Sequence, residues 1–454
     1  MPKLKSKTET SEHGWIPAGV SAIKWFLSKF KPVPKDWIVK RDSLKKSKTI
    51  KCESFDEVIA TWQVCMRWRD DLENVLVAML SVVVSTEQIG DQLFLQVIGD
   101  AGSGKTRFCD AFLTSPTCHA LEHITGFHSG FKGTGDEDYS LISRINRKTL
   151  ITPEGDVMMS SPKFKEIMSQ QRRIFDGTSG ATYKNQAEDV RYTGLRTPWI
   201  IAGTPTLMDS DQSRLGDRFL RVCIESPDYE ERRKIQRVVA LSALTSVRVK
   251  SCAKDKKLTN SDMEEAYAKT GGYVSFLRNN AEDMIKKVEI PEDLIEQCCD
   301  LGEFTADFRA RPNADANSET DDTKELPTRL THQFVRLMCC VAACTQRKEA
   351  DEYVMRIVKK IAIDSSRGRT LDIARVLFEN QSEGLENKGI VNRCNLTPNE
   401  VRKMIRFMRG IGIVESFTVK TKTAVKGVRR TDKLKFRLTE RVDSLMESII
   451  AEEA

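Results

Sequence analysis

The spacing of apolar residues changes several times along the chain, and each change predicts a new element. Between Phe55 and Thr86 apolar residues recur at three- and four-residue steps, which predicts two helices. The segment DQLFLQVIGDAGSGKT (91–106) then shows a short apolar run, a glycine cluster and a helix beginning near Lys105. Short apolar runs alternate with amphipathic segments up to about Glu225, which predicts an α/β domain.

The second half of the chain has mostly helical spacing. Residues Asp228–Cys299 and Pro327–Asp364 fit helices, and they flank the polar segment Asp307–Glu325, which we predict to be a mobile loop or linker. From about Thr370 the pattern predicts three helices and then two strands. This order of elements is that of a winged helix.

The third of these C-terminal helices, Thr397–Arg409, begins with a good N-cap and a proline in its first turn. Its expected buried face is Val401, Met404, Ile405 and Met408. The cations left outward are Arg402, Lys403, Arg406 and Arg409, and the hairpin between the two strands adds Lys422, Lys426, Arg429 and Arg430. Such a surface suits nucleic-acid phosphates, with a solvated loop or a protein-docking face as alternatives.

Composition narrows the class of protein. The chain has 454 residues, 40% hydrophobic and 30% charged, with a formal net charge of +7. No apolar stretch reaches the roughly 20 residues that a membrane helix needs. The twelve cysteines form no CxxC pair, and Cys339, Cys340 and Cys344 lie in an apolar run typical of a helical core rather than a metal site. We therefore expect a cytoplasmic protein with no membrane partner, in the host cytoplasm if a phage encodes it.

The N-terminal fifty residues are basic, and Trp15, Trp25 and Trp37 lie among the lysines. Aromatic rings among cations can stack bases while the cations contact phosphates. A solvated tail before a small helical unit with tryptophan in its core explains the pattern equally well.

Residues Gly99–Thr106 match GxxxxGK[ST] at every required position, between a predicted strand and a predicted helix. Glycines let backbone N–H groups converge on phosphates, and the helix offers its positive N-terminus. Lys105 is expected to reach the β- and γ-phosphates of ATP, and the Thr106 hydroxyl to bind Mg²⁺. The expected ATP-contacting set is Gly99, Asp100, Ala101, Gly102, Ser103, Gly104, Lys105, Thr106 and Arg107.

A P-loop ATPase also needs an acid at the end of a neighbouring strand to hold Mg²⁺ and polarise the attacking water. The best candidate follows Lys148–Thr152, where Glu154 is the first choice and Asp156 the second. Both are expected to serve as metal and catalytic residues. A surface turn is the alternative, because PEGD is good turn chemistry.

Two further segments supply candidate catalytic residues. Trp199–Gly203 predicts a buried strand that ends next to Thr204, whose hydroxyl is placed to orient water near the γ-phosphate. Arg214 and Arg218 follow in a short loop, where they are candidate arginine fingers that reach across a subunit boundary. A structural salt bridge is the alternative role for each arginine.

The order of these motifs resembles the AAA+ class of ring-forming ATPases. Leu95–Ile224 is similar to ATPases encoded beside replication genes in bacteriophages and mobile elements, which show a "DG" after an arginine-rich helix (here Gln170–Gly177) and a G-[DE]-R-F element (here Gly216–Phe219). Leu326–Leu337 resembles the sensor-2 helix of minichromosome-maintenance helicases, which implies that Arg329 touches the γ-phosphate in the lid. The similarity covers about the middle half of the chain, and proline stands at 153 where an aspartate is common.

The resemblance implies an α/β fold with a P-loop AAA+ core and a division into four regions. These are a basic helical N-terminal region (1–85), the ATPase core (86–227), a helical lid with the sensor-2 segment and the polar insert 307–325 (228–366), and a winged-helix domain (367–454).

The resemblance also implies a hexameric ring that binds ATP and Mg²⁺ between subunits and moves on single-stranded or forked DNA, with other replication proteins as further partners. Lys105, Thr106 and Glu154 would come from one subunit and Arg218 from the next. The glycine-rich segment His123–Asp138 is a candidate pore loop or a simple surface loop. The leading hypothesis is a helicase-like replication ATPase. The alternatives are a helicase loader or remodeller, and a nucleotide-gated DNA-binding origin or regulatory protein.

Overall fold

The computed structural model describes residues 49–88, 90–122, 124, 126–128, 140–182, 190–208, 218–237, 240, 261–312, 324–419 and 433–450. They belong to one compact unit, Ser47–Ala454. Several predicted features lie outside these residues: the basic N-terminal region up to residue 48, most of the segment 123–138, Arg214, and the hairpin cations Lys422, Lys426, Arg429 and Arg430.

A five-stranded parallel sheet forms the centre of the fold, in the order β2-β3-β6-β1-β7. Its strands are β1 (Phe94–Ile98), β2 (Cys118–Ala120), β3 (Thr149–Thr152), β6 (Trp199–Gly203) and β7 (Phe219–Cys223). All residues of β1, β3, β6 and β7 are buried, as expected for parallel strands with helices on both faces. The predicted α/β class is confirmed, including the strands expected before the P-loop, before Pro153 and at Trp199.

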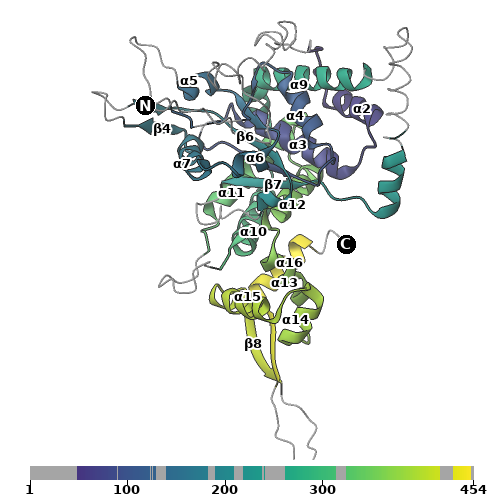
Figure 1. Ribbon diagram of the computed structural model, residues 1–454, viewed down its shortest axis with the longest axis vertical. Coiled ribbons are helices and arrows are strands. Elements are labelled where there is room, and N and C mark those ends of the chain that lie inside the picture. Colours follow the sequence, from purple (N-terminus) through teal and green to yellow (C-terminus); the bar gives the residue numbers. More distant parts are fainter. Residues whose placement is uncertain are drawn as a thin grey trace, which may run out of the picture. The chain divides into compact units, whose positions relative to one another are not determined.

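Alternate residues of each strand enter two different cores. One core holds Leu95, Ile200 and Leu220. Next to the sheet it includes residues of α2 (Phe55–Cys65), α3 (Asp70–Ser85), α4 (Lys105–Leu113) and α9 (Ser261–Lys286), and it continues into the helices that follow in the sequence. The other core holds Phe94 and Trp199. Its helices are α5 (Leu141–Ile145), α6 (Gly155–Met159) and α7 (Phe164–Phe175), as Figure 1 shows around the sheet.

An antiparallel hairpin not predicted from the sequence lies between α7 and β6. It consists of β4 (Thr178–Ala181) and β5 (Val190–Thr193). A short 3₁₀ helix, η1 (Pro205–Met208), follows β6. The hairpin and η1 lie in the part of the chain where the sequence predicted only short apolar runs and amphipathic segments.

Helix α12 (Glu352–Ser366) packs along the outer edge of β7, and side chains of α10 (Glu292–Arg309) and α11 (Thr328–Cys344) also reach the start of this strand. The backbone N–H of Cys223 donates to Asp364 Oδ2 at 2.8 Å, and that of Arg221 donates to Ser365 Oγ at 2.9 Å. Gln333 Nε2 donates to the Arg218 carbonyl at 2.9 Å. Side chains therefore hydrogen-bond to backbone groups of β7 that would otherwise be open to pairing with another strand.

The polar segment predicted from Asp307 begins later in the structure. Helix α10 continues to Arg309, and the Asp307 side chain is fully buried. Its carboxylate pairs with Lys324 at 2.7 Å and with Arg441 at 2.7 Å. These two cations stabilise a residue whose sequence context suggested a loop, so the linker interpretation is wrong for residues 307–309.

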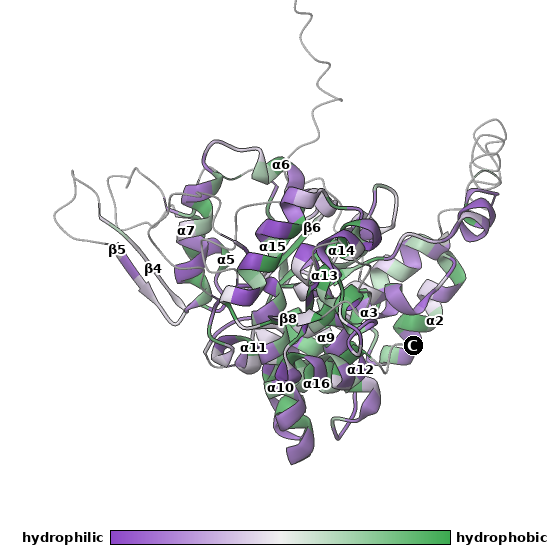
Figure 2. Ribbon diagram, turned by 90° about the horizontal axis from the view of Figure 1, so that it is seen from below, coloured by the Kyte–Doolittle hydropathy of each residue, from purple (hydrophilic) through white to green (hydrophobic). Residues whose placement is uncertain are grey.

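The C-terminal residues form the predicted three helices and strand pair, followed by an unpredicted helix. The elements are α13 (Arg369–Phe378), α14 (Asn387–Cys394), α15 (Pro398–Gly410), β8 (Val414–Val419), β9 (Lys433–Leu438) and α16 (Glu440–Ile450). Thr397 and Glu400 form a capping box at the start of α15. The expected buried face of α15 is confirmed, and Figure 2 shows both hydrophobic and hydrophilic colour along this helix. Among the described helices, none is both long and apolar enough for a membrane crossing.

Candidate functional site

The glycine-rich loop lies at the carboxyl end of β1, between β1 and α4, in the strand–loop–helix context that the motif requires. Strand β1 has β6 on one side and β7 on the other, and ligands of open α/β sheets bind beyond the carboxyl ends of such central strands. Gly102 and Gly104 have φ of +83° and +100°, which disfavours other residues. An added Cβ at Gly102 would meet nothing within 4 Å, so the loop has open space beside it.

Lys105 is folded into this loop. Its Nζ donates to the carbonyls of Gly99 at 2.5 Å and Asp100 at 2.7 Å, and to Ser103 Oγ at 3.1 Å. Burial lowers the pKa of Lys105, and the carboxylates of Asp156 and Asp100 oppose that shift. The ammonium group is therefore hydrogen-bonded to atoms of the loop itself, and a bound phosphate can replace those partners. Thr106 and Arg107, by contrast, are exposed at the N-terminus of α4.

The two candidate acids after β3 have different surroundings. Asp156 Oδ2 accepts from the Thr204 N–H at 2.9 Å, and Asp156 Oδ1 accepts from the hydroxyls of Thr204 at 3.1 Å and Thr206 at 2.6 Å. Glu154 is the N-cap residue of α6, but its exposed side chain makes no capping hydrogen bond. The structure thus brings Asp156 and Thr204 together and leaves Glu154 at the surface beside them.

Close packing holds the start of α6 against strand β6. Gly155 approaches β6 so tightly that an added Cβ would lie 2.4 Å from Ile201 Cγ2 and 3.2 Å from the Ala202 carbonyl. Only glycine fits there without a shift of the strand. Lys105, Asp156 and Thr204 consequently gather at the carboxyl ends of β1, β3 and β6.

The described residues near the glycine-rich loop offer few protein ligands for a cation. Among the described residues, no three His, Cys, Asp or Glu side chains gather into a cation-binding group. Mg²⁺ that accompanies a nucleotide keeps several waters and is held by phosphates with only one or two protein ligands. Thr106, Glu154 and Asp156 stay the predicted protein ligands of such a cation.

Arg218 lies at the opposite end of the strands from the glycine-rich loop. These amino ends of the strands are called the amino edge of the sheet. Arg218 directly precedes β7, whose first residue pairs with the first residue of β1, whereas the glycine-rich loop follows the last residue of β1. Five residues at about 3.3 Å each separate the two edges by roughly 16 Å. The guanidinium binds Asp176 through Nη2 at 3.1 and 3.2 Å and lies 5.2 Å from the ring centre of Phe175. Arg218 therefore does not contact the P-loop of its own chain.

Arg329 belongs to this same amino edge. It pairs with Glu325, and Gln333, one turn further along α11, binds the Arg218 carbonyl. Helix α11 packs along α3, and through Gln333 it reaches the residue before β7, so Arg329 lies away from the glycine-rich loop of its own chain. The expected contact of Arg329 with a γ-phosphate stays a prediction.

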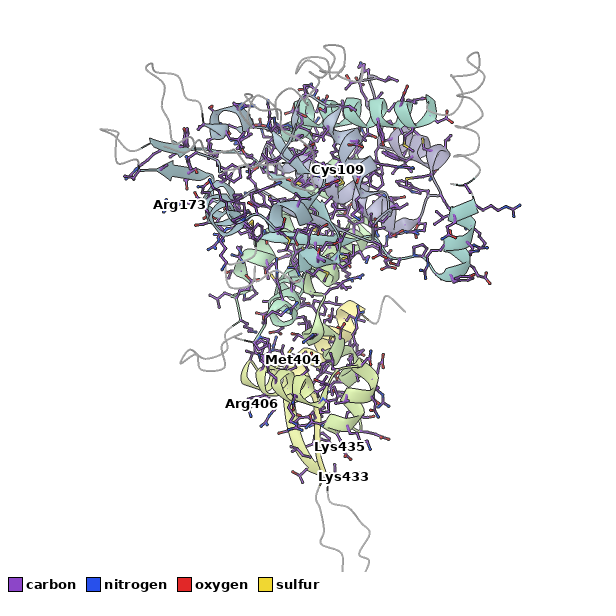
Figure 3. All side chains as sticks on the ribbon, viewed as in Figure 1. Cys109, Arg173, Met404, Arg406, Lys433 and Lys435 are labelled. Carbon is purple, nitrogen blue, oxygen red and sulfur yellow. The ribbon has the colours of Figure 1, made fainter. Side chains whose placement is uncertain are left out.

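The predicted outward cations of α15 are confirmed as exposed: Arg402, Lys403, Arg406 and Arg409. Figure 3 labels Arg406 on this helix and Lys433 and Lys435 on the adjoining strand. These two lysines were not singled out in the sequence. Lys433 pairs with Glu386 at 2.8 Å, and Lys435 donates to the Glu383 carbonyl at 2.9 Å.

Sequence reasoning missed two contacts of the candidate residues. Asp176 holds Arg218, and its only sequence signal was the "DG" that follows the arginine-rich helix. Ser226 donates to the Asp100 carboxylate across the mouth of the loop, and nothing in its sequence context indicated this. Comparison of the chain with protein-family models gave no match, and comparison with curated protein sequences gave none either.

Proposed function

We propose that this chain is an AAA+-type P-loop ATPase that hydrolyses Mg²⁺-ATP and uses the energy to move on DNA as a helicase-like replication protein. The observation that carries the proposal is the convergence of Lys105, Asp156 and Thr204 beyond β1 in a parallel sheet of order β2-β3-β6-β1-β7. This order and the capped, cationic α15 also support the AAA+ core and the winged-helix unit.

Each residue has a role in the proposed reaction. The amides of Gly99–Thr106 and the Lys105 ammonium bind the triphosphate, with Mg²⁺ neutralising charge when it is bound. Glu154, exposed just after β3, accepts a proton from the attacking water. Asp156 orients the Thr204 hydroxyl, which positions that water.

The arginines at the amino edge support a reaction shared between subunits. Arg218 and Arg329 lie at the opposite edge from their own P-loop, so a ring is the arrangement that brings them to a triphosphate. Charge-stabilising arginines supplied across an interface are common in phosphoryl transfer.

The first test compares Lys105→Ala with the parent for ATP hydrolysis and for strand displacement on a forked substrate. We expect both activities to fall by at least about 100-fold, because the change removes the ammonium from the triphosphate. Lys286→Ala is the control, since Lys286 is exposed on α9 and pairs with Glu282 across one helical turn. Full hydrolysis by Lys105→Ala contradicts the site assignment.

The cationic face of α15 also favours the alternative of a nucleotide-gated DNA-binding regulator. Sequence-specific DNA binding with slow turnover and no strand displacement would support that alternative. Stimulated loading of a separate helicase, again without displacement, would support a loader.

A further inference from the structure

A series of polar contacts leads from the glycine-rich loop toward the C-terminal helices. It begins at Ser226, whose hydroxyl donates to the Asp100 carboxylate across the mouth of the loop. Asp100 is also held through its carbonyl, which accepts from Lys105 Nζ at 2.7 Å and from the Ser103 N–H at 3.1 Å. A phosphate that takes the ammonium of Lys105 removes one of these contacts, and the Ser226 hydroxyl then has a larger share in holding Asp100.

The preceding residue, Glu225, is held by both its backbone and its side chain. Its N–H donates to Asp71 Oδ2 at 3.0 Å, and its carbonyl accepts from Arg69 Nη2 at 3.1 Å. Its carboxylate pairs with Lys360 at 3.1 Å and with Arg367 at 3.4 Å. Glu225 therefore ties the segment after β7 both to the start of α3 and to the C-terminal part of α12.

The two cations that pair with Glu225 also bind a buried acid, Asp364. Its Oδ1 lies 3.0 Å from Lys360 Nζ and 2.8 Å from Arg367 Nε, and its other oxygen accepts the Cys223 N–H. The Asp364 side chain is fully buried, whereas that of Glu225 is 59% exposed. Exposed ion pairs contribute little to stability, so Asp364 holds the cations in place while their contacts with Glu225 can break at small cost.

The link between α12 and α13 continues these contacts into the C-terminal helices. Arg367 is the C-cap residue of α12, and Gly368, with φ of +145°, is the N-cap residue of α13. The next residue, Arg369, pairs with Glu400 at 2.8 Å. Glu400 is the acid of the capping box at the start of α15, the helix with the exposed cations. Contacts of described residues therefore connect Asp100 with the N-terminus of α15.

We propose that these contacts couple the glycine-rich loop to the C-terminal helices, so that a nucleotide at the loop and DNA on α15 strengthen each other's binding. DNA that holds α15 also holds the link between α12 and α13, which keeps Arg367 on Glu225. Ser226 is then in position to bind Asp100 when a phosphate has taken the ammonium of Lys105. Each ligand thereby lowers the ordering cost of the other. The inference rests on the proposed function and specifies how its nucleotide site is regulated.

The experiment measures the affinity of the full chain for a fluorescent forked DNA by anisotropy, with and without a non-hydrolysable ATP analogue and Mg²⁺. The ratio of the two dissociation constants is the coupling factor, and we expect the analogue to tighten DNA binding by at least about fivefold. By linkage, the DNA should tighten binding of the analogue by the same factor. DNA binding that is unchanged or weakened by the analogue in the parent overturns the proposal.

Variants at two of the contacts test whether they carry the coupling. Ser226→Ala and Glu225→Gln are each expected to reduce the coupling factor below about twofold, whereas Ser226→Thr keeps a hydroxyl and should retain the parent's factor. Glu282→Gln is the matched control for Glu225→Gln, since Glu282 is also an exposed acid paired with a lysine, on α9. A local charge effect shifts both dissociation constants alike and leaves their ratio unchanged. Parental ratios in Ser226→Ala and Glu225→Gln therefore overturn the proposal.

Amide hydrogen exchange of residues 366–372 gives a second measurement that needs no nucleic acid. We expect the ATP analogue to slow exchange of these amides at least about threefold in the parent and to leave it unchanged in Ser226→Ala. An analogue that binds the parent without any effect on these amides overturns the coupling and leaves the ATPase proposal intact. A failure of the ATPase proposal appears instead in the Lys105→Ala hydrolysis assay.

Discussion

Replacing Glu154 by Gln and Asp156 by Asn, one at a time, tests which of these two acids acts in catalysis and which stabilises the site. Asp156 accepts three hydrogen bonds from Thr204 and Thr206, whereas the Glu154 side chain is exposed and caps nothing. We expect Glu154→Gln to lose catalysis and keep stability. Asp156→Asn is expected to lose less catalysis and some stability.

The structure sets the size of each effect. In Asp156→Asn the amide oxygen can accept the Thr204 N–H while the NH₂ group donates to the two hydroxyls, so all three hydrogen bonds survive without charge. Hydrogen bonds to charged groups contribute about 1.5–3 kcal/mol and neutral ones about 1 kcal/mol. Because Thr206 is exposed, water replaces part of the difference, and we expect a loss of about 1–2 kcal/mol.

Glu154→Gln changes an exposed side chain, so its free energy of unfolding should stay within about 0.5 kcal/mol of the parent. Loss of a general base typically reduces the rate by about 10²–10⁴. Asp156→Asn keeps the hydrogen bonds that orient Thr204 and removes only their charge, so we expect a smaller loss of about tenfold in kcat.

The measurements are phosphate release at saturating Mg²⁺-ATP, affinity for a fluorescent ATP analogue, and urea unfolding. Glu122→Gln is the control, because Glu122 is an exposed acid that follows the neighbouring strand β2. If Asp156→Asn lost hydrolysis as completely as expected for Glu154→Gln, with nucleotide affinity intact, Asp156 would be the base. The division of roles proposed here would then be refuted.

Two other predictions concern Arg218 at the amino edge and Asp364 beside β7. Arg218→Ala subunits mixed with Lys105→Ala subunits should recover hydrolysis that neither variant shows alone, since each supplies what the other lacks; an active monomer would contradict a shared site. Asp364→Ala leaves the buried Cys223 N–H and two cations without their partner, so urea unfolding should show a loss of about 3–5 kcal/mol in the free energy of unfolding. The exposed Glu282→Ala is the control, with an expected loss of at most about 0.5 kcal/mol. Equal losses would show that the contacts at the outer edge of β7 contribute little.

Local pattern was enough to predict much of the fold. Helical periodicity placed α2 and α3, and the N-cap at Thr397 with a proline in the first turn placed the start of α15. Buried apolar runs placed β1 and β6. These features succeed because spacing, capping and turn chemistry act within a few residues of each other.

Features that depend on distant partners were missed or misread. Asp307 lies in a polar stretch, yet Lys324 and Arg441 pair with it and let α10 continue to Arg309. The β4–β5 hairpin and α16 also escaped prediction, because their short segments become stable only against α7 and α10. Propensity is weak where tertiary contacts supply most of the stabilisation.

The glycine-rich loop could be recognised from the chain alone, since its motif needs only a strand before it and a helix after it. Which of the remaining candidates lie near that loop depends on the three-dimensional fold. It brought Asp156 and Thr204 to the carboxyl edge, and it put Arg218 and Arg329 at the amino edge. The physical reason is that strand order and direction, set by burial of both sheet faces, fix the edge at which each side chain emerges.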